Sequence, residues 1–401
     1  MSEFVSLLKT CEISTGKLDS NAMVIGGKYP FFTCAPNPLS INTYSYDDDV
    51  ILLAGNNAAG KFHCQRYCGK FDAYQRTYII KSKSGFDIDY IYYYLKMNLL
   101  AFSKRAQGSQ TKFLTMKILN DFIIKNINFD NQIKLSSVLK NIDQKIQINN
   151  QINQELEAMA KTLYDYWFVQ FDFPDQNGNP YKSSGGKMVY NPELKREIPE
   201  GWGVEKLKDK LSVSRGISYK TENIKDNIGT PMINLASIDI NRNYKSTGLK
   251  YFNGEYLKEK IVSGGDLLIA CTDLTRNADI VGSPIIVPFD EQKYVFSMDL
   301  AKIDSKVDFI NKYYLYSTLR TEHYHNYIKK WASGTNVLHL NLDGMNWYSI
   351  SVPPIELQEE YSQIILNFSK KTNKNIQENQ ELTQLRDWLL SMLMNGQVKV
   401  E

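Results

Sequence analysis

The sequence predicts an α+β protein that contains one unit twice, a mixed α/β globular block followed by a long helix that pairs with its counterpart. Three observations support this: an internal repeat, two long segments with helical periodicity, and strand-like segments confined to the preceding blocks. The chain has 401 residues, more than one ordinary hydrophobic core requires, and 43% are hydrophobic. We therefore expect a folded protein with several domains.

The repeat is clearest between segments 106–163 and 332–389. With a constant offset of 226, Gly108 matches Gly334, Gln132 matches Gln358, and the tetrapeptide NQEL recurs at 153–156 and 379–382. Upstream the offset changes, as loops of different length require. The pair Tyr92-Tyr93 matches Tyr313-Tyr314 at 221, and Leu52 and Ala54 match Leu268 and Ala270 at 216. One register held without a gap from residue 106 to residue 163 indicates a duplication.

Apolar residues spaced mostly three and four apart predict the two long helices. They are Leu135, Val138, Ile142, Ile146, Ile152, Leu156, Met159, Leu163 and Tyr166, and then Leu357, Tyr361, Ile364, Phe368, Ile376, Leu382, Leu385 and Leu389. About 35 helical residues would be on the order of 50 Å long. Asn149, Asn153, Asn375 and Asn379 fall on or beside the apolar face. They either fix the register of paired helices or lie on a solvated face, and the sequence favours neither interpretation.

The segment between the halves, 172–199, is rich in Pro, Gly, Asn and Ser, which predicts a linker with turns rather than part of a core. In the second block, 206–211 resembles a short helix. The segments 231–235, 266–271 and 280–287 are strand candidates.

Catalytic and metal-binding motifs are incomplete. Gly55 to Lys61 satisfies GxxxxGK, but Phe62 stands where a phosphate-binding loop needs Ser or Thr, and the next residues are a poor helix start. A P-loop NTPase is therefore an unfavoured alternative, as is a coiled-coil scaffold without DNA affinity. His63 with Cys64 and Cys68, and His323 with His325, lack further ligands, so no metal site is predicted. The sequence contains neither the motifs of DNA amino-methyltransferases nor a nuclease constellation.

Basic residues are concentrated in the first block. Residues 1–128 carry 15 Lys or Arg against 10 Asp or Glu, and residues 101–125 carry five against one. The matched segments 106–112 and 332–338 each combine Gly with hydroxyl and amide side chains, and basic residues precede both. Such side chains contact DNA phosphates and read base edges, although a structural turn that caps the adjacent Tyr-rich helix explains the pattern equally well. The candidate DNA-binding residues are Lys104, Arg105, Gln107, Ser109, Gln110, Lys112, Arg276, Asn277, Lys329, Lys330, Thr335 and Asn336.

Three motifs resemble the specificity subunits of type I restriction–modification systems. They are LYDYWFVQFD at 163–172, KSSGGKM at 182–188 and REIPEGW at 196–202. Gln170 departs from the usual Asp of the first motif, and the first block begins without its own Pro-x-Gly-Trp entry. Nearly the whole chain follows the family's order of parts.

The resemblance implies a division into two target-recognition domains and two conserved helices that pack as an antiparallel coiled coil. The expected parts are a first recognition domain at 1–128, a helix at 129–171, a linker at 172–199, a second recognition domain at 200–354, a helix at 355–395 and a tail at 396–401. Each domain would read one half of a split target in double-stranded DNA. Residues expected in the coiled coil and in subunit docking are Asn149, Asn153, Leu156, Leu163, Trp167, Asn375, Asn379, Leu382 and Leu389.

The resemblance also implies that the chain has no catalytic residues. Two methyltransferase subunits would dock on the helices and use S-adenosylmethionine, and two motor-nuclease subunits would use ATP and Mg²⁺. We expect no cofactor in this chain. The five scattered cysteines favour reduced thiols, and MSEFVSLLKT lacks the pattern of a signal peptide, so a cytoplasmic protein without a membrane partner is expected.

Overall fold

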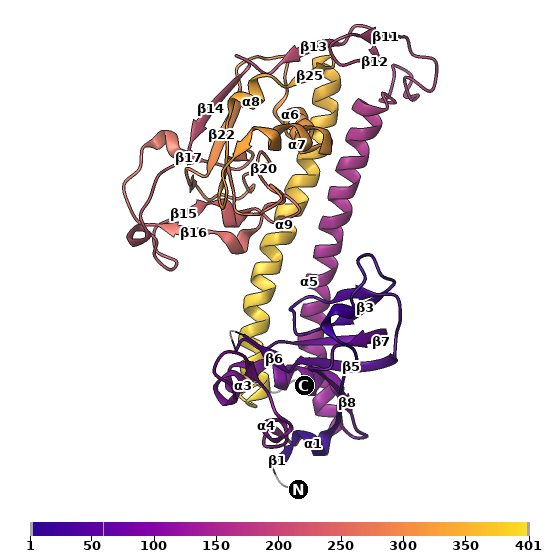
Figure 1. The fold of residues 1–401 in the computed structure, drawn as a ribbon, viewed down its shortest axis with the longest axis vertical. Helices are drawn as coiled ribbons and strands as arrows, with labels where there is room; N and C mark the ends of the chain where they lie inside the picture. Colours follow the sequence, from indigo (N-terminus) through magenta and orange to yellow (C-terminus); the bar gives the residue numbers. More distant parts are fainter. Residues whose placement is uncertain (1–2, 59, 399–401) are drawn as a thin grey trace. The chain divides into compact units, whose positions relative to one another are not determined.

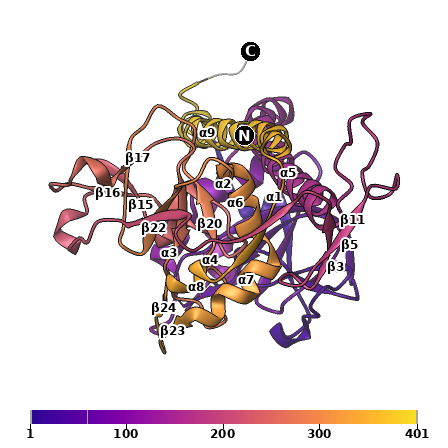
Figure 2. The ribbon, with the colours of Figure 1, turned by 90° about the horizontal axis from the view of Figure 1, so that it is seen from above.

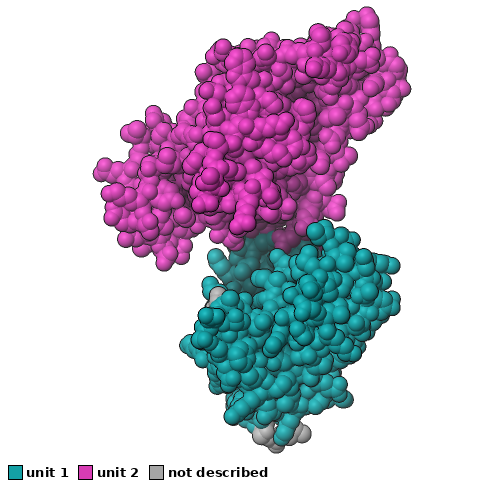
Figure 3. All heavy atoms as spheres, viewed as in Figure 1, with its two compact units in different colours: residues 1–148, 379–401 teal, residues 149–378 magenta. Residues whose placement is uncertain are grey.

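The computed structural model describes residues 3–58 and 60–398. They form two compact units, unit 1 from residues 1–148 and 379–401 and unit 2 from residues 149–378 (Figure 3). Figure 1 shows the two long helices, α5 (Phe129–Tyr164) and α9 (Ile355–Met394). Each contributes residues to both units. Among the described residues, no helix is long and apolar enough to cross a membrane.

Unit 1 is built on a six-stranded sheet with the order β2-β8-β5-β7-β3-β4. Its strands are β2 (Cys11–Thr15), β3 (Tyr29–Phe32), β4 (Leu39–Ile41), β5 (Tyr46–Ala54), β7 (Cys64–Ala73) and β8 (Thr77–Ser82). Neighbours are antiparallel except β3 and β7. β5 lies between two strands, and the aliphatic run from Val50 to Ala54 is buried along its whole length.

Short elements complete unit 1. β1 (Phe4–Ser6) pairs with β10 (Ile123–Lys125), and β6 (Asn56–Asn57) pairs with β9 (Lys112–Phe113). The helices are α1 (Leu7–Thr10), α2 (Ile88–Met97), α3 (Leu99–Arg105), α4 (Met116–Asn120) and the N-terminal part of α5. The Asp87 carboxylate caps α2 by accepting from the Tyr90 N–H at 2.8 Å. The buried face of α2 packs in one core with Leu139 of α5 and Leu390 of α9.

Unit 2 repeats this connectivity. The order β14-β22-β18-β20 corresponds to β2-β8-β5-β7, and β16-β15-β21-β17 corresponds to the part with β4 and β3. The pair β15–β21 is parallel, as β3–β7 is in unit 1, and β15 lies beside β16 (Figure 2). The strands are β14 (Leu211–Arg215), β15 (Thr230–Ile233), β16 (Lys250–Phe252), β17 (Ile261–Val262), β18 (Leu267–Ala270), β20 (Pro284–Ile286), β21 (Tyr294–Phe296) and β22 (Leu300–Ser305).

The short pairs recur as well. β13 (Gly203–Lys206) pairs with β25 (Ser349–Val352), as β1 does with β10. The three-stranded sheet of β19 (Thr272–Asp273), β24 (Leu338–Leu340) and β23 (Ala332–Ser333) contains the counterpart of β6–β9. The helices are α6 (Lys312–Arg320), α7 (Glu322–Ile328), α8 (Asp343–Asn346) and the N-terminal part of α9. The predicted duplication is therefore present at the level of strand pairing.

Hydrogen bonds correct the predicted alignment of the Tyr-rich helices α2 and α6. Tyr90 donates its hydroxyl proton to the Lys125 carbonyl at 3.0 Å, and Tyr314 donates to the Ser351 carbonyl at 2.6 Å. Tyr314 is thus the counterpart of Tyr90, an offset of 224, and the match of Tyr92-Tyr93 with Tyr313-Tyr314 was wrong. Runs of adjacent tyrosines can be aligned equally well in several registers. The correct register is identified only by the hydrogen-bond partners of the tyrosine hydroxyl groups.

The segment predicted as a linker is folded into unit 2. β11 (Met188–Asn191) and β12 (Arg196–Pro199) form an antiparallel hairpin, and Phe173 and Ile198 belong to the hydrophobic core. The Asp172 carboxylate accepts from both the N–H and the hydroxyl of Ser183 at 2.7 Å. The prediction of a segment outside the core was wrong because its Pro, Gly and Asn residues form turns between core-forming aromatic residues.

Two further predictions on local structure were wrong. The segment 206–211 is not a short helix, since β13 ends at Lys206, Asp209 has a left-handed φ of 60° and β14 begins at Leu211. On the long helices, Met159, Tyr166 and Leu385 were placed on the apolar face but are 53%, 38% and 44% exposed. After Tyr164, the π-helical turn Asp165–Val169 changes the spacing, so that Trp167 and Phe168 enter the core instead.

Candidate nucleic-acid interface

In unit 1 the predicted DNA-binding segment forms a hairpin that follows α3. The backbones of Gln107 and Phe113 exchange hydrogen bonds of 3.1 and 2.9 Å, and β9 pairs with β6 in the preceding loop. Gly108 lies in the turn with φ +97°, and a Cβ there would meet the Thr111 carbonyl oxygen at 2.1 Å. Only glycine allows this tight turn, which presents the side chains from Ser109 to Thr111 to solvent.

The matched segment of unit 2 forms the equivalent hairpin. β23 and β24 enclose a turn at Gly334, which has φ +137° and whose added Cβ would meet the Val337 carbonyl oxygen at 2.0 Å. One backbone hydrogen bond also recurs, from Leu114 N–H to the Gly55 carbonyl in unit 1 and from Leu340 N–H to the Cys271 carbonyl in unit 2, at 2.8 and 2.9 Å. Both segments are structural turns, as one interpretation predicted, but they follow α3 and the turn Lys329–Trp331 and do not cap the Tyr-rich helices α2 and α6. The same geometry leaves their polar side chains available to a ligand.

The predicted DNA-binding residues lie on these hairpins and on the segments beside them. Lys104 and Arg105 end α3, Lys329 and Lys330 belong to a single 3-10 turn (Lys329–Trp331), and Arg276 and Asn277 lie in the loop after β19. Because β19 pairs with β24, this loop and the hairpin of unit 2 are adjacent. All twelve predicted residues are exposed except Lys112 and Lys329, which are half-buried. Their contacts with DNA stay a prediction.

Asp273 is a buried residue that supports this surface and that sequence reasoning missed. It is completely buried and organises the loop that carries Arg276 and Asn277: one carboxylate oxygen accepts from Thr275 N–H at 2.6 Å, and the other from Ile280 N–H and Val281 N–H at 2.7 and 2.8 Å. At the offset of 216 its counterpart is Asn57, whose side-chain oxygen accepts from the Lys61 N–H at 3.2 Å. The offset of 216 pairs two Asx residues, but the sequence does not indicate that either one organises its loop.

The GxxxxGK segment is the loop that supports the unit 1 hairpin. It connects β5 through β6 to strand β7, and Ala59 within it lies outside the described residues. A phosphate-binding loop must lead into a helix whose N-terminus faces the phosphates. The segment leads into a strand, so its geometry does not fit a P-loop.

The candidate metal ligands are not brought together. Cys64 is buried in the core, where burial raises the pKa of its thiol to about 12, whereas Cys68 is exposed. Among the described residues, no group of three or more His, Cys, Asp or Glu side chains is arranged to hold a metal ion. His325 of α7 is buried, and burial and the nearby Arg242 charge lower its pKa.

Buried polar side chains lie between the long helices. In unit 2 the Asn149 amide donates to Glu378 at 2.8 Å, and the Asn375 amide donates to Asn153 at 2.8 Å. The numbers rise along α5 while they fall along α9, so the helices run antiparallel in this unit. In unit 1, Arg386 of α9 pairs with Asp143 of α5 at 2.8 Å, which continues the same antiparallel order.

The remaining predicted coiled-coil residues contribute mainly to intramolecular packing. Trp167 belongs to the core of unit 2 and Leu163 packs against it, while Leu389 packs against the core of unit 1. Leu156, Asn379 and Leu382 are half-buried. Their role in subunit docking stays a prediction.

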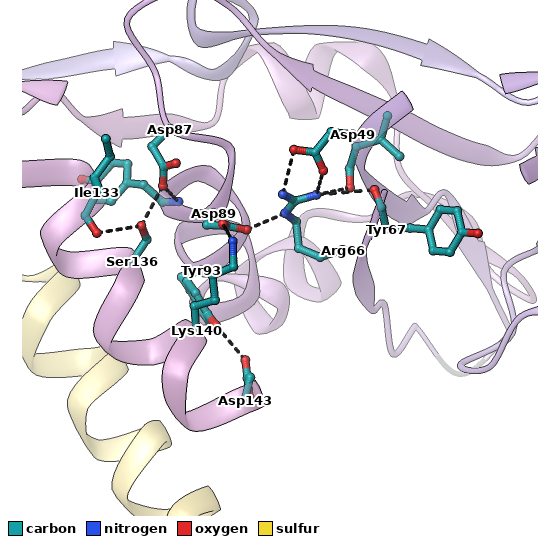
Figure 4. A network of polar contacts seen from close by, with 12 residues as sticks. Asp49, Arg66, Tyr67, Asp87, Asp89, Tyr93, Ile133, Ser136, Lys140 and Asp143 are labelled. Carbon is teal, nitrogen blue, oxygen red and sulfur yellow. Dashed lines mark hydrogen bonds and ion pairs between the residues drawn. The ribbon is translucent and has the colours of Figure 1, made fainter. Parts of the chain in front are cut away.

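An ionic network joins the sheet of unit 1 to α2 and α5 (Figure 4). Arg66 of β7 pairs with Asp49 of β5 at 2.6 Å and with Asp89 of α2 at 2.7 Å, and Lys140 of α5 reaches Asp89 at 2.6 Å. Burial alone would raise the pKa of Asp89, but the hydrogen bonds and charges of Lys140 and Arg66 lower it. The first block is thereby attached to its own long helix by charged groups as well as by the core.

The fold defines a class of protein: a duplicated α+β chain with one exposed polar hairpin per half and a long helix after each. The chain belongs to the family of the type I restriction modification DNA specificity domain, whose profile matches residues 2–158 and 199–384. The predicted family and fold class are confirmed.

Named relatives agree with this assignment. The specificity subunit of type I restriction enzyme EcoDI from Escherichia coli is 31% identical over 209 residues, which cover 49% of this chain and 46% of that protein. The MjaIX specificity subunit from Methanocaldococcus jannaschii is 27% identical over 333 residues, 80% of this chain and 71% of that protein. The crystal structure of a type I restriction–modification S subunit from M. genitalium has a TM-score of 0.60 at 14% identity and covers 97% of this chain and 95% of that chain, which supports the shared fold.

Proposed function

We propose that this chain is the non-catalytic subunit that selects the DNA target of a type I restriction–modification enzyme, and that it reads a bipartite sequence. The observation that carries the proposal is the recurrence, once in each unit, of a glycine-turned hairpin supported by a loop that an Asx side chain organises. Each such element precedes a long helix. Two equivalent readers, one in each half of a duplicated chain, suit two half-sites separated by unread base pairs.

The side chains divide into those suited to phosphates and those suited to bases. Lys104, Arg105 and Lys330 are exposed cations on helical turns beside the hairpins, where phosphate contacts need charge but no fixed geometry. Amides such as Gln110 and Asn336, at the turns, can make bidentate hydrogen bonds to adenine. Arg276 lies on a loop that Asp273 fixes, which is the rigidity that bidentate recognition of guanine requires.

The long helices would serve as the spacer and as the docking platform for two methyltransferase subunits and two motor-nuclease subunits. S-adenosylmethionine, ATP and Mg²⁺ would bind those partners and not this chain. Because many predicted docking residues are used in internal packing, we propose that docking uses exposed apolar side chains of the same helices. Examples are Ile148 on α5 and Leu385 and Trp388 on α9, which are 50%, 44% and 55% exposed.

The proposal is tested by co-expressing the chain with its cognate methyltransferase subunit and mapping methylated adenines in the host DNA. The expected result is one motif with two fixed parts separated by a constant number of unread base pairs. The matched control replaces Gly334 by Val, which should strain the unit 2 hairpin and reduce methylation without changing the motif. Methylation at a single contiguous motif, or none that depends on this chain, would contradict the proposal.

A further inference from the structure

Each long helix is joined to its preceding block by the same buried side-chain amide. In unit 1 Gln132, on the first turns of α5, accepts from the Asp87 N–H at 2.8 Å and donates to the carbonyls of Ile127 at 2.9 Å and Gly85 at 3.5 Å. In unit 2 Gln358 accepts from the Asn311 N–H at 2.9 Å and donates to the carbonyls of Pro353 at 2.8 Å and Phe309 at 2.9 Å. Every partner in unit 2 is the counterpart of the partner in unit 1.

A serine one helical turn further on completes the arrangement. Ser136 donates to the Asp87 carboxylate at 2.7 Å, and Ser362 donates to the Asn311 side-chain oxygen at 2.6 Å. These Asx side chains also cap the Tyr-rich helices α2 and α6. We call each set a helix clamp: Asp87, Gln132 and Ser136 in unit 1, and Asn311, Gln358 and Ser362 in unit 2.

The clamps fix a direction because their glutamines are buried and bonded to three segments. Gln132 and Gln358 are 1% and 0% exposed, and Ser136 and Ser362 are 3% and 4% exposed. Each amide contacts the start of the Tyr-rich helix, the turn before it, and the chain that leads from the last strand into the long helix. A buried amide keeps all these bonds in only one orientation, so the long helix can leave its block in only one direction.

Other contacts at the two joints differ in chemistry. Unit 1 uses ion pairs such as Lys140 of α5 with Asp89 of α2, whereas unit 2 packs the aromatic ring of Tyr361 of α9 in the same apolar core as Tyr314 of α6. The helix clamp is a polar arrangement that both joints share. A feature retained while the surrounding chemistry differs points to a geometrical requirement common to both halves.

We propose that the helix clamps are positioning elements that fix how each recognition block is oriented on its long helix, and thereby set the spacer length that the protein accepts. This inference rests on the proposed function. One base pair more or less between half-sites moves one of them by about 3.4 Å and rotates it by about 35° around the DNA axis. Blocks fixed at a set angle reject that displacement, and blocks that pivot on their helices accept it.

The test measures binding by complexes of the full chain with its methyltransferase subunit. The wild-type target is first selected from a pool of randomised duplexes, and probes are then made with the spacer one base pair shorter, unchanged and one base pair longer. For Gln132→Ala and Gln358→Ala, the affinity for altered spacers relative to the unchanged spacer should rise about tenfold, a discrimination of the size that one base-pair mismatch produces. Selectivity for the bases of each half-site should stay as in the wild type.

Matched variants separate positioning from loss of stability. Asn234→Ala removes another buried amide of unit 2, one that is bonded to Gly248 and Ala236 within the recognition block, and should leave spacer selectivity unchanged. Ser362→Ala is a milder change in the clamp and serves if a glutamine variant does not fold. Spacer selectivity equal to wild type in folded clamp variants would overturn the inference. A wild-type complex with no spacer preference would instead contradict the proposed function.

Discussion

At the residue scale, the proposed DNA interface depends on cations beside the hairpin turns. Arg105 ends α3 and Lys112 lies in β9, on the two sides of the unit 1 hairpin turn. Each phosphate that a cation neutralises releases counterions from DNA, so the affinity for DNA falls more steeply with salt as phosphate contacts increase.

We therefore expect Arg105→Ala and Lys112→Ala each to weaken DNA binding and to reduce the slope of log affinity against log salt by about one. Binding titrations of the complex over a series of salt concentrations measure this. Lys187→Ala is the control, because Lys187 is an exposed lysine paired with Glu200 on the β11–β12 hairpin. A slope as steep as wild type in both hairpin variants would assign these residues to the structural turn alone.

At the residue scale, the sequence predicted the hairpins but not the side chains that hold the neighbouring loops in place. Glycine in a short polar segment repeated at a fixed offset is sufficient to predict a turn, as at Gly108 and Gly334. Asp273 was not predicted, because an acidic residue in sequence gives no sign that three backbone N–H groups will surround its carboxylate. Such support depends on a loop conformation that local sequence patterns do not determine.

At the element scale, polar side chains pair between the two long helices, and these pairs show which turn of α5 lies opposite which turn of α9. Asn149 bonds Glu378 and Asn153 bonds Asn375. Buried amides of this kind favour one register, since any slip leaves them without partners. The segments 149–152 and 375–378 therefore face each other and form one matched turn.

Deleting residues 149–152 together with 375–378 should keep the remaining register and shorten the spacer that the protein accepts. Four helical residues span about 6 Å, so the preferred spacer should shorten by about two base pairs, with both half-sites unchanged. Mapping of methylated adenines reads the spacing directly. Deleting only one of the two segments is the control, which should put the helices out of register and reduce activity at every spacing. An unchanged spacer in the double deletion would show that the length of the helices does not set the spacer length.

Periodicity predicted the existence of both long helices but not which apolar residues face inward. Met159 was assigned to the buried stripe because its spacing fits, yet it is exposed, whereas small Ala160 packs against the core. Which residues face inward depends on the partner helix and, after Tyr164, on the π-helical turn. Neither can be predicted from the sequence of one helix alone. For the same reason the sequence did not predict that segment 172–199 is folded, because its core residues contact residues that are distant in sequence.

At the scale of the whole molecule, the repeated connectivity makes each recognition block a module with its own core and its own joint. The block of unit 1 shares its core with α5 and α9, and Asp87 is the residue through which its Tyr-rich helix meets the clamp. The predicted boundary at residue 128 lies just before α5 begins at Phe129, so a junction there leaves Gln132 and Ser136 in the recipient helix.

Replacing residues 1–128 by the corresponding block of another family member should change one half of the methylated motif and leave the other half and the spacer as they were. The condition is that the donor block supplies an Asx cap at the position of Asp87, because the recipient's Gln132 and Ser136 need that partner. A donor block with this residue changed to Ala is the control: it should give the same new half-site with a relaxed spacer. Motif mapping distinguishes the outcomes, and a change in both halves after the first exchange would show that the blocks do not read DNA independently.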